Sequence, residues 1–177
     1  HQVDMLRWWL GEPKSVIGQA LTVIPDRVCK NTGEAWTATA DDLAHFTLEM
    51  ASGALAQVFM SGVAATNVGN ETLIFGSKGT IRLSNGNEKL FLAKVGEDFR
   101  DISVEDPHAS LGDLNVGIWN VSVLAALQEL TAAITEGRRL RRGASFVDGL
   151  RNQMVLDAVF ASTASRKWED LDMTGTI

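Results

Sequence analysis

The first residues of the chain offer two side chains that could take part in acid–base chemistry. His1 and Asp4 open the stretch HQVDMLRWWLGEP, and a separation of three residues places them on one face of a helix. The imidazole of histidine has a pKa near neutrality, which suits it to give or accept a proton during a reaction. The residues alone also fit a plainer interpretation, in which His1 is a frayed terminal residue and Asp4 a first-turn carboxylate favoured by the helix dipole.

The element that must carry these two residues is a helix over residues 1–10. Its apolar positions recur at helical spacing, at Val3, Leu6 and Leu10. Gly11 suits a C-cap, and Pro13 prevents the helix from continuing. Residues 15–24 (SVIGQALTVI) are then predicted as a strand, and the polar stretch 25–35 (PDRVCKNTGEA) as a loop.

The middle of the chain changes to a period of two. Within residues 41–50 (DDLAHFTLEM) one face carries Ala44, Phe46, Leu48 and Met50, and the other carries Leu43, His45, Thr47 and Glu49. Further strand-like segments follow, separated by turns such as ASGA, SKG and NGN: 54–64, 70–76, 80–84, 88–95 and 99–104. Sequential antiparallel strands of this kind favour one wide sheet.

The C-terminal part returns to helical spacing. Residues 119–136 form one predicted helix, which Gly137 ends. Ser145 and Asp148 resemble a capping box, and they open a second helix over 146–165. Strands followed by helices predict an α+β fold, an open, predominantly antiparallel sheet with helices packed on one face, in a single domain over residues 1–177.

Composition excludes several classes of function. The net charge of -6 argues against nucleic acid as the main partner. The single cysteine, Cys29, allows no internal disulfide and is interpreted as an inert residue in a reducing, cytoplasmic compartment. No apolar run reaches the length of a membrane span.

Complete catalytic and cofactor motifs are missing from the sequence. It contains no GxGxxG, no Walker motif and no GxSxG, and GSKGT is a hairpin turn rather than a phosphate loop. The three histidines (His1, His45 and His108) have no zinc-ligand spacing, so no metal site is predicted.

Four stretches, in order, resemble the C-terminal domain of the Gfo/Idh/MocA oxidoreductases, the relatives of glucose-fructose oxidoreductase and inositol dehydrogenase. They are HQVDMLRWWLGEP, DDLAHFTLEMASGALAQV, NETLIFGSKGTIRL and SFVDGLRNQMVLDAVFASTASRKWEDL. The resemblance implies that the chain is truncated at its N-terminus. A Rossmann domain with the glycine-rich motif and a catalytic lysine would precede it, and would bind NAD or NADP; this chain carries no cofactor-binding residues of its own.

The resemblance also assigns roles to two residues. His1 matches the histidine of the family's D-x-x-x-H motif, a catalytic residue that transfers a proton or orients the substrate, and the motif's aspartate would lie before His1. Asp4 matches a residue that can contact substrate hydroxyls. The expected function is substrate binding and oligomerisation within an NAD(P)-dependent oxidoreductase acting on a sugar, polyol or related compound, or on a glycosidic bond through the same hydride step.

A second hypothesis is a non-catalytic dimerisation module of the same fold. Apolar residues on both faces of the predicted strands, such as Leu43 and Phe46, suggest that a second subunit covers the open sheet face, giving a homo-oligomer.

Other positions keep two interpretations. Trp8 and Trp9 suit a core or interface, or a ligand platform. His108 in the loop 105–117 suits a surface loop or a substrate contact. RRLRR (138–142) suits a solvated segment or an anion site.

Overall fold

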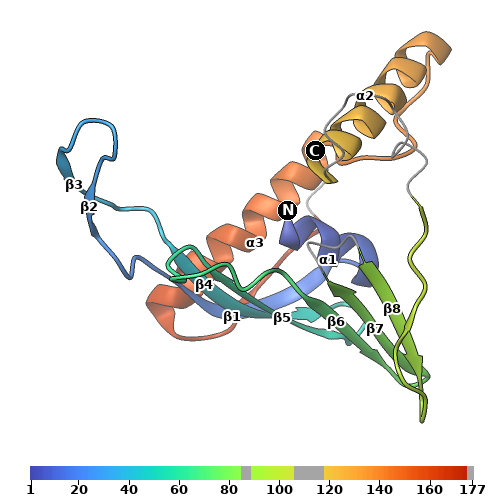
Figure 1. Ribbon diagram of the computed structural model, residues 1–177, viewed down its shortest axis with the longest axis horizontal. Helices are drawn as coiled ribbons and strands as arrows, with labels where there is room; N and C mark the ends of the chain where they lie inside the picture. The colour runs from blue at the N-terminus through green and yellow to red at the C-terminus, as the bar shows by residue number, and fades with distance from the viewer. Residues whose placement is uncertain (85–88, 106–117, 175–177) are drawn as a thin grey trace. The chain divides into compact units, whose positions relative to one another are not determined.

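The computed structural model describes residues 1–84, 89–105 and 118–174. Its elements, in chain order, are α1 (Gln2–Leu10), β1 (Pro13–Leu21), β2 (Asp26–Val28), β3 (Ala35–Thr37), β4 (Leu43–Met50), β5 (Leu55–Ser61), β6 (Thr72–Gly76), β7 (Gly79–Ser84), β8 (Lys89–Lys94), β9 (Arg100–Asp101), α2 (Ile118–Glu136), α3 (Phe146–Ser165) and β10 (Glu169–Asp170) (Figure 1). They form two compact units, His1–Ala65 with Ala144–Ile177, and Thr66–Gly143.

The first unit is built on a four-stranded antiparallel sheet in the order β10-β1-β4-β5. The alternation predicted for β4 is confirmed, because Phe46, Leu48 and Met50 are buried, whereas Thr47 and Glu49 between them are only partly buried and His45 before them is exposed. The predicted α+β class with an open, predominantly antiparallel sheet is therefore confirmed. The strand β10, which was not predicted, pairs with the start of β1.

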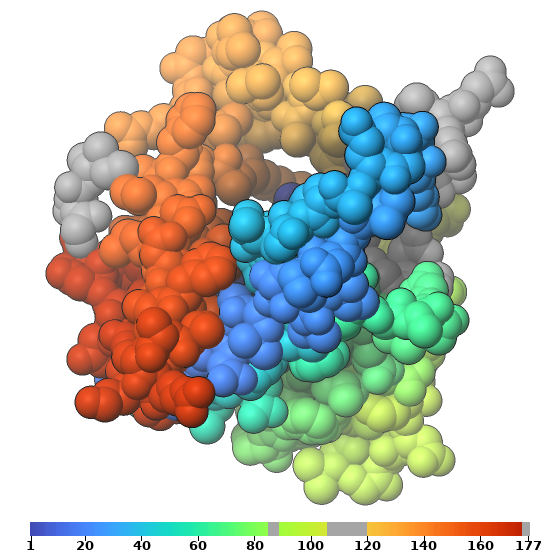
Figure 2. Space-filling model, turned by 90° about the vertical axis from the view of Figure 1, so that its left-hand side faces the viewer, coloured from blue at the N-terminus to red at the C-terminus, as the bar shows by residue number. Residues whose placement is uncertain are grey.

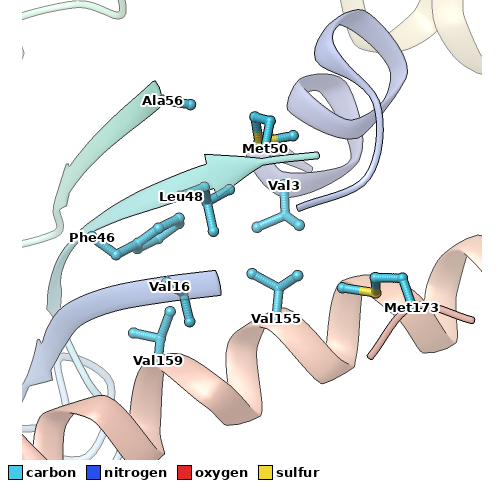
Figure 3. Packing of buried hydrophobic residues seen from close by; sticks show 9 residues of the cluster. All are labelled: Val3, Val16, Phe46, Leu48, Met50, Ala56, Val155, Val159 and Met173. Carbon is cyan, nitrogen blue, oxygen red and sulfur yellow. The ribbon is translucent and has the colours of Figure 1, made fainter. Parts of the chain in front are cut away.

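The core of the first unit lies between this sheet and α3. Val155 and Val159 point from α3 toward Val16 and Leu48 of the sheet, and Val3 of α1 packs beside them (Figure 3). Burying a side chain of this size stabilises the fold by about 1.5–3 kcal/mol. The opposite face of the sheet carries the exposed side chains of His45, Leu55 and Phe59, and we call it the open face.

The side chains of α3 also satisfy the backbone of β1. Ser162 is fully buried, and its Oγ accepts a hydrogen bond from the Gly18 N–H (3.0 Å) and donates one to the Lys167 carbonyl (2.7 Å). The Thr163 hydroxyl accepts from the Ala20 N–H (2.9 Å). Two donors of β1 that would otherwise be buried without a partner are thereby paired, which fixes α3 along this strand.

The stretch predicted as a loop, residues 25–35, is instead part of a two-stranded ribbon, and that prediction was wrong. β2 pairs with β3 through three residue pairs, and Gly33 adopts a positive φ of 75° in the turn. Asp42 anchors the base of the ribbon, because its carboxylate accepts the N–H groups of Val23 and Ile24 and pairs with Arg27 Nη2 at 2.6 Å. The ribbon projects from the sheet in Figure 1. In Figure 2 its blue atoms lie on the side that faces the viewer.

The second unit contains another antiparallel sheet, in the order β6-β7-β8-β9. The predicted SKG hairpin is confirmed by the pairing of Gly76 with Gly79. The NGN turn (85–87) lies outside the described residues, but the strands that flank it pair from Ser84 and Lys89 onward. The prediction of one wide sheet was wrong: the strands form two four-stranded sheets and the ribbon. The sequence period defines each strand but not which strands become neighbours.

The helix α2 of the second unit confirms the helix predicted before Gly137, which has a positive φ of 62°. The ranges α1 and α3 also match the predicted helices closely, and the Ser145–Asp148 capping box of α3 is present. Of the helices that the structure describes, none is long and apolar enough to cross a membrane.

Candidate active site

Helix α1 presents the two residues that the sequence singles out. His1 is its N-cap residue and is exposed, and its carbonyl accepts the Met5 N–H at 3.0 Å. Asp4 follows in the first turn, with 39% of its side chain exposed. The C-cap Gly11, at a φ of 90°, ends the helix and donates its N–H to the Arg7 carbonyl. His1 therefore caps a short, well-terminated helix, and Asp4 lies in its first turn.

The Asp4 carboxylate is held by a neighbouring helix. Its Oδ1 accepts a hydrogen bond from Asn152 Nδ2 of α3 at 2.9 Å, and it lies 3.6 Å from Arg7 Nη1. These contacts give Asp4 a structural role beyond that of a first-turn charge, and they leave part of the side chain at the surface.

Arg7 is the centre of this contact, and the sequence analysis missed it. Only 5% of its side chain is exposed. Its Nε and Nη2 bind the two Glu12 carboxylate oxygens at 2.7 and 2.9 Å. Nη1 donates to Asn152 Oδ1 at 2.8 Å and to the Asp148 carbonyl at 3.2 Å, and Nη2 to Asp148 Oδ1 at 3.3 Å. We call the following residues the Arg7 cluster: Asp4, Arg7, Glu12, Asp148, Arg151 and Asn152.

The electrostatics of the Arg7 cluster favour its charged state. The hydrogen bond from Arg7 is the main cause that lowers the pKa of Glu12, and Arg151 Nη1 binds the same carboxylate at 2.8 Å. The pKa of Asp148 is lowered chiefly by hydrogen bonds from Ser145, and Arg7 adds to this effect. The Glu12 hydrogen bond in turn raises the pKa of Arg7. Asp148 thus caps α3 and binds α1 with the same side chain.

A signal for this cluster is present in the sequence. Arg7 stands four residues after Val3, so it occupies the buried stripe of α1 rather than its polar face. An arginine on a buried stripe needs carboxylate partners. Glu12, directly after the helix, is the partner that local sequence could have indicated.

The other residues that the sequence singles out lie apart from the Arg7 cluster. His45 is on the open sheet face, with Nε2 at 3.1 Å from Gln19 Oε1. Trp8 is 84% exposed, which excludes a core role for it within the described chain. Cys29 is a free thiol in the β2–β3 turn region. His108 and residues 106–117 lie outside the described residues.

The arginine-rich segment 138–142 is bound to α2. The Glu129 carboxylate accepts hydrogen bonds from Arg138 Nη1 (2.7 Å) and from the Arg141 N–H, and Arg138 also pairs with Glu136. These contacts lower the pKa of Glu129 to about 2, and the hydrogen bond from Arg138 has the largest effect. This favours the interpretation of a segment held at a helix C-terminus. The charge of its first arginine, Arg138, is balanced by Glu129 and Glu136. Among the described residues, no three or more His, Cys, Asp or Glu side chains are arranged to hold a metal ion.

Comparisons with known proteins agree with the fold. Residues 1–82 match the family model described as the GFO/IDH/MocA C-terminal domain. Glucose-fructose oxidoreductase domain-containing protein 2 of Xenopus laevis is 26% identical over 148 residues, covering 77% of this chain and 38% of that protein. These matches confirm the resemblance to the Gfo/Idh/MocA C-terminal domain that was found in the sequence.

Solved structures show the same fold over nearly the whole chain. Levoglucosan dehydrogenase in complex with NADH and L-sorbose superposes with a TM-score of 0.79 at 25% identity, covering 96% of this chain and 48% of that one. An oxidoreductase domain protein from Kribbella flavida gives a TM-score of 0.77 at 27% identity, covering 97% of this chain and 48% of its own. The chain spans about half the length of these structures and less of the curated relative.

Proposed function

We propose that the chain is the substrate-binding and oligomerisation domain of an NAD(P)-dependent oxidoreductase that acts on a hydroxyl-bearing carbon of a sugar, polyol or related compound. The observation that carries the proposal is the placement of exposed His1 and partly exposed Asp4 at the start of one helix, which the Arg7 cluster fixes to α3. The likeness to levoglucosan dehydrogenase, solved with NADH and with levoglucosan or L-sorbose, supports the substrate class.

The cofactor part of the proposal assigns NAD or NADP mainly to a Rossmann domain outside this chain. The absence of a GxGxxG motif from the sequence supports this division, as does the coverage of only about half of each related structure. The exposed N-cap position of His1 suits a residue that meets a substrate and cofactor held by another domain. When bound, the nicotinamide supplies the hydride acceptor or donor at the reacting carbon.

The residues of this chain would then handle the substrate and one proton. Oxidation of an alcohol to a carbonyl releases a hydride from carbon and a proton from the hydroxyl oxygen. The His1 imidazole would accept that proton, or donate it in the reverse direction, while the Asp4 carboxylate would accept a hydrogen bond from a substrate hydroxyl. Holding the substrate in this way raises the fraction of bound molecules in a reactive orientation.

The experiment for this function uses the full-length protein. Nicotinamide absorbance is followed with NAD or NADP against levoglucosan, L-sorbose, glucose and myo-inositol, beside a His1→Ala variant. Turnover that falls about 100-fold or more in the variant is the expected result for a lost acid–base group. Absence of both cofactor binding and turnover in the unaltered protein would contradict the proposal.

Oligomerisation through the open face of the first sheet is part of the same proposal. Leu55 and Phe59 on this face are 69% and 71% exposed, and Leu43 lies on the neighbouring strand on the same side. An apolar sheet face of this kind suits coverage by a second copy. A homo-oligomer in a reducing cytoplasm is the expected state.

A second candidate function, a dimerisation module without catalysis, rests on the same exposed sheet face. This candidate predicts the same oligomer but no proton transfer. Oligomeric state and nicotinamide binding, measured on the same protein, therefore distinguish the two functions. An oligomeric full-length protein that binds no nicotinamide would favour the second candidate.

A further inference from the structure

The side-chain amide of Asn152 joins Arg7 to Asp4. Its Oδ1 accepts a hydrogen bond from Arg7 Nη1 at 2.8 Å, and its Nδ2 donates to Asp4 Oδ1 at 2.9 Å. An amide has one accepting end and one donating end, so this pair of contacts is directional. A flipped amide would point its NH₂ group at the guanidinium and its oxygen at the carboxylate, which both partners oppose.

Arg7 is itself unable to turn. Its guanidinium makes five hydrogen bonds, to Glu12, to Asp148 and to Asn152, and its side chain is almost completely buried. A fixed planar guanidinium fixes the amide that binds it. The orientation of Asn152 is therefore set by Arg7, and the rotamer of Asp4 is set by Asn152.

Building on the proposed function, we propose that Asn152 and Arg7 are positioning residues that hold the Asp4 carboxylate, and with it the His1 turn of α1, in the orientation in which both meet the substrate. Neither positioning residue needs to touch the substrate. Arg7 also braces the helix, whereas Asn152 acts on the side chain of Asp4 itself. A substitution of Asn152 can therefore change the orientation of the site while the fold stays intact.

The test replaces Asn152 by aspartate in the full-length protein. Asn152→Asp keeps the size of the side chain and the acceptor toward Arg7, but it places a carboxyl oxygen about 2.9 Å from Asp4 Oδ1, the distance of the present hydrogen bond. Two carboxylates this close cannot both ionise easily, so one pKa of the pair is raised. Below that pKa the shared proton restores a donor toward Asp4, and above it the two carboxylates repel.

The charged groups around this pair keep the interpretation specific. They come from α1, from the residue before β1 and from α3, and they are Arg7, Glu12, Asp148 and Arg151. All four are unchanged in the variant, so a new pH dependence reports the altered pair. A matched control is Gln153→Glu on the next residue, which also turns an amide into a carboxylate beside an aspartate, because Gln153 Nε2 donates to Asp157 at 2.7 Å.

The measurement is the ratio of variant to unaltered kcat/KM with levoglucosan and NAD⁺ across the pH range, with the unfolding temperature taken at each pH. For Asn152→Asp we expect a ratio near one at low pH and a loss of about 10- to 100-fold at high pH, since a small misplacement of site residues has effects of this size. Asn152→Leu, which has neither donor nor acceptor, should lose activity at every pH. Gln153→Glu should follow the unaltered protein throughout.

Two results would overturn the inference. A ratio for Asn152→Asp that stays constant with pH would show that the Asp4 contact does not matter to turnover. A loss that follows the unfolding temperature alone would assign Asn152 a structural role only. If the unaltered protein shows neither cofactor binding nor turnover, the proposed function itself fails, which is a distinct outcome from either of these.

Discussion

At the scale of the residue, Arg7 decides how α1 is held. A buried guanidinium is costly unless carboxylates and carbonyls surround it, and Glu12, Asp148 and Asn152 supply these partners. The cluster joins residues 141 and 145 positions apart in the sequence. The site that we propose for His1 and Asp4 would thus depend on one side chain that need not take part in the chemistry.

The first prediction concerns the stability that Arg7 provides. Arg7→Met should lower the free energy of unfolding by about 2–3 kcal/mol, because it removes charge-assisted hydrogen bonds to the partly exposed carboxylates of Glu12 and Asp148. Urea unfolding measures the change. The exposed Arg139 gives a matched control, since Arg139→Met should stay within about 0.5 kcal/mol. Equal effects of the two substitutions would contradict the proposed contribution of Arg7 to stability.

The second prediction is the pH dependence of this cluster. The pKa values of Glu12 and Asp148 are lowered in the folded state, so the unfolded chain binds more protons in acid. The stability that they contribute is present above about pH 4, the ordinary range of these carboxyls, and is lost as the pH falls toward their lower folded-state values. Glu12→Gln should flatten this part of the profile of unfolding free energy against pH. A profile with the same slope in both proteins would contradict the role of Glu12.

At the scale of the element, the contact of α3 with β1 places the helices on the sheet. Ser162 and Thr163 bind the N–H groups of Gly18 and Ala20. Gly18 also allows a close approach, because a Cβ there would lie 2.4 Å from the Cβ of Phe46. Since the Arg7 cluster bridges α1 and α3, a shift of α3 along β1 would move the His1 turn as well.

The third prediction tests that contact. Ser162→Ala should lower the free energy of unfolding by about 1–3 kcal/mol, because it leaves the Gly18 N–H and the Lys167 carbonyl without their buried partner. Ser165, which is exposed and binds Glu169, is the control, and Ser165→Ala should cost much less. Denaturant unfolding of both variants gives the comparison. A Ser162→Ala protein as stable as the parent would show that water replaces the hydroxyl.

The sequence predicted those parts of the fold that local periodicity determines. The α1 stripe, the alternation of β4 and the capping box of α3 involve residues a few positions apart, and all three are confirmed. The Arg7 cluster, β10 and the division into two sheets depend on contacts between distant segments, which local pattern does not specify. The β2–β3 ribbon was missed because its strands are only three residues long and its anchor, Asp42, lies beyond it.

At the scale of the whole molecule, the open face of the first sheet is the surface that a second copy would cover. Phe59→Glu should shift the protein toward a smaller species in size-exclusion chromatography with light scattering, since a carboxylate at the centre of an apolar interface is left without a partner. Val104 is even more exposed than Phe59 but lies outside the strands, so Val104→Glu is the control and should leave the assembly unchanged. A parent protein that is monomeric at every concentration would contradict the proposed oligomer.

The central claim is that this domain handles the substrate and its proton, whereas another domain binds the cofactor. Its most direct test is a single turnover of the full-length protein with bound NAD⁺ and levoglucosan, in which His1→Ala is compared with the unaltered protein. The predicted result is an unchanged dissociation constant for NAD⁺ and a fall of about 100-fold or more in the rate at which NADH forms. An equal rate of NADH formation in both proteins would contradict the claim.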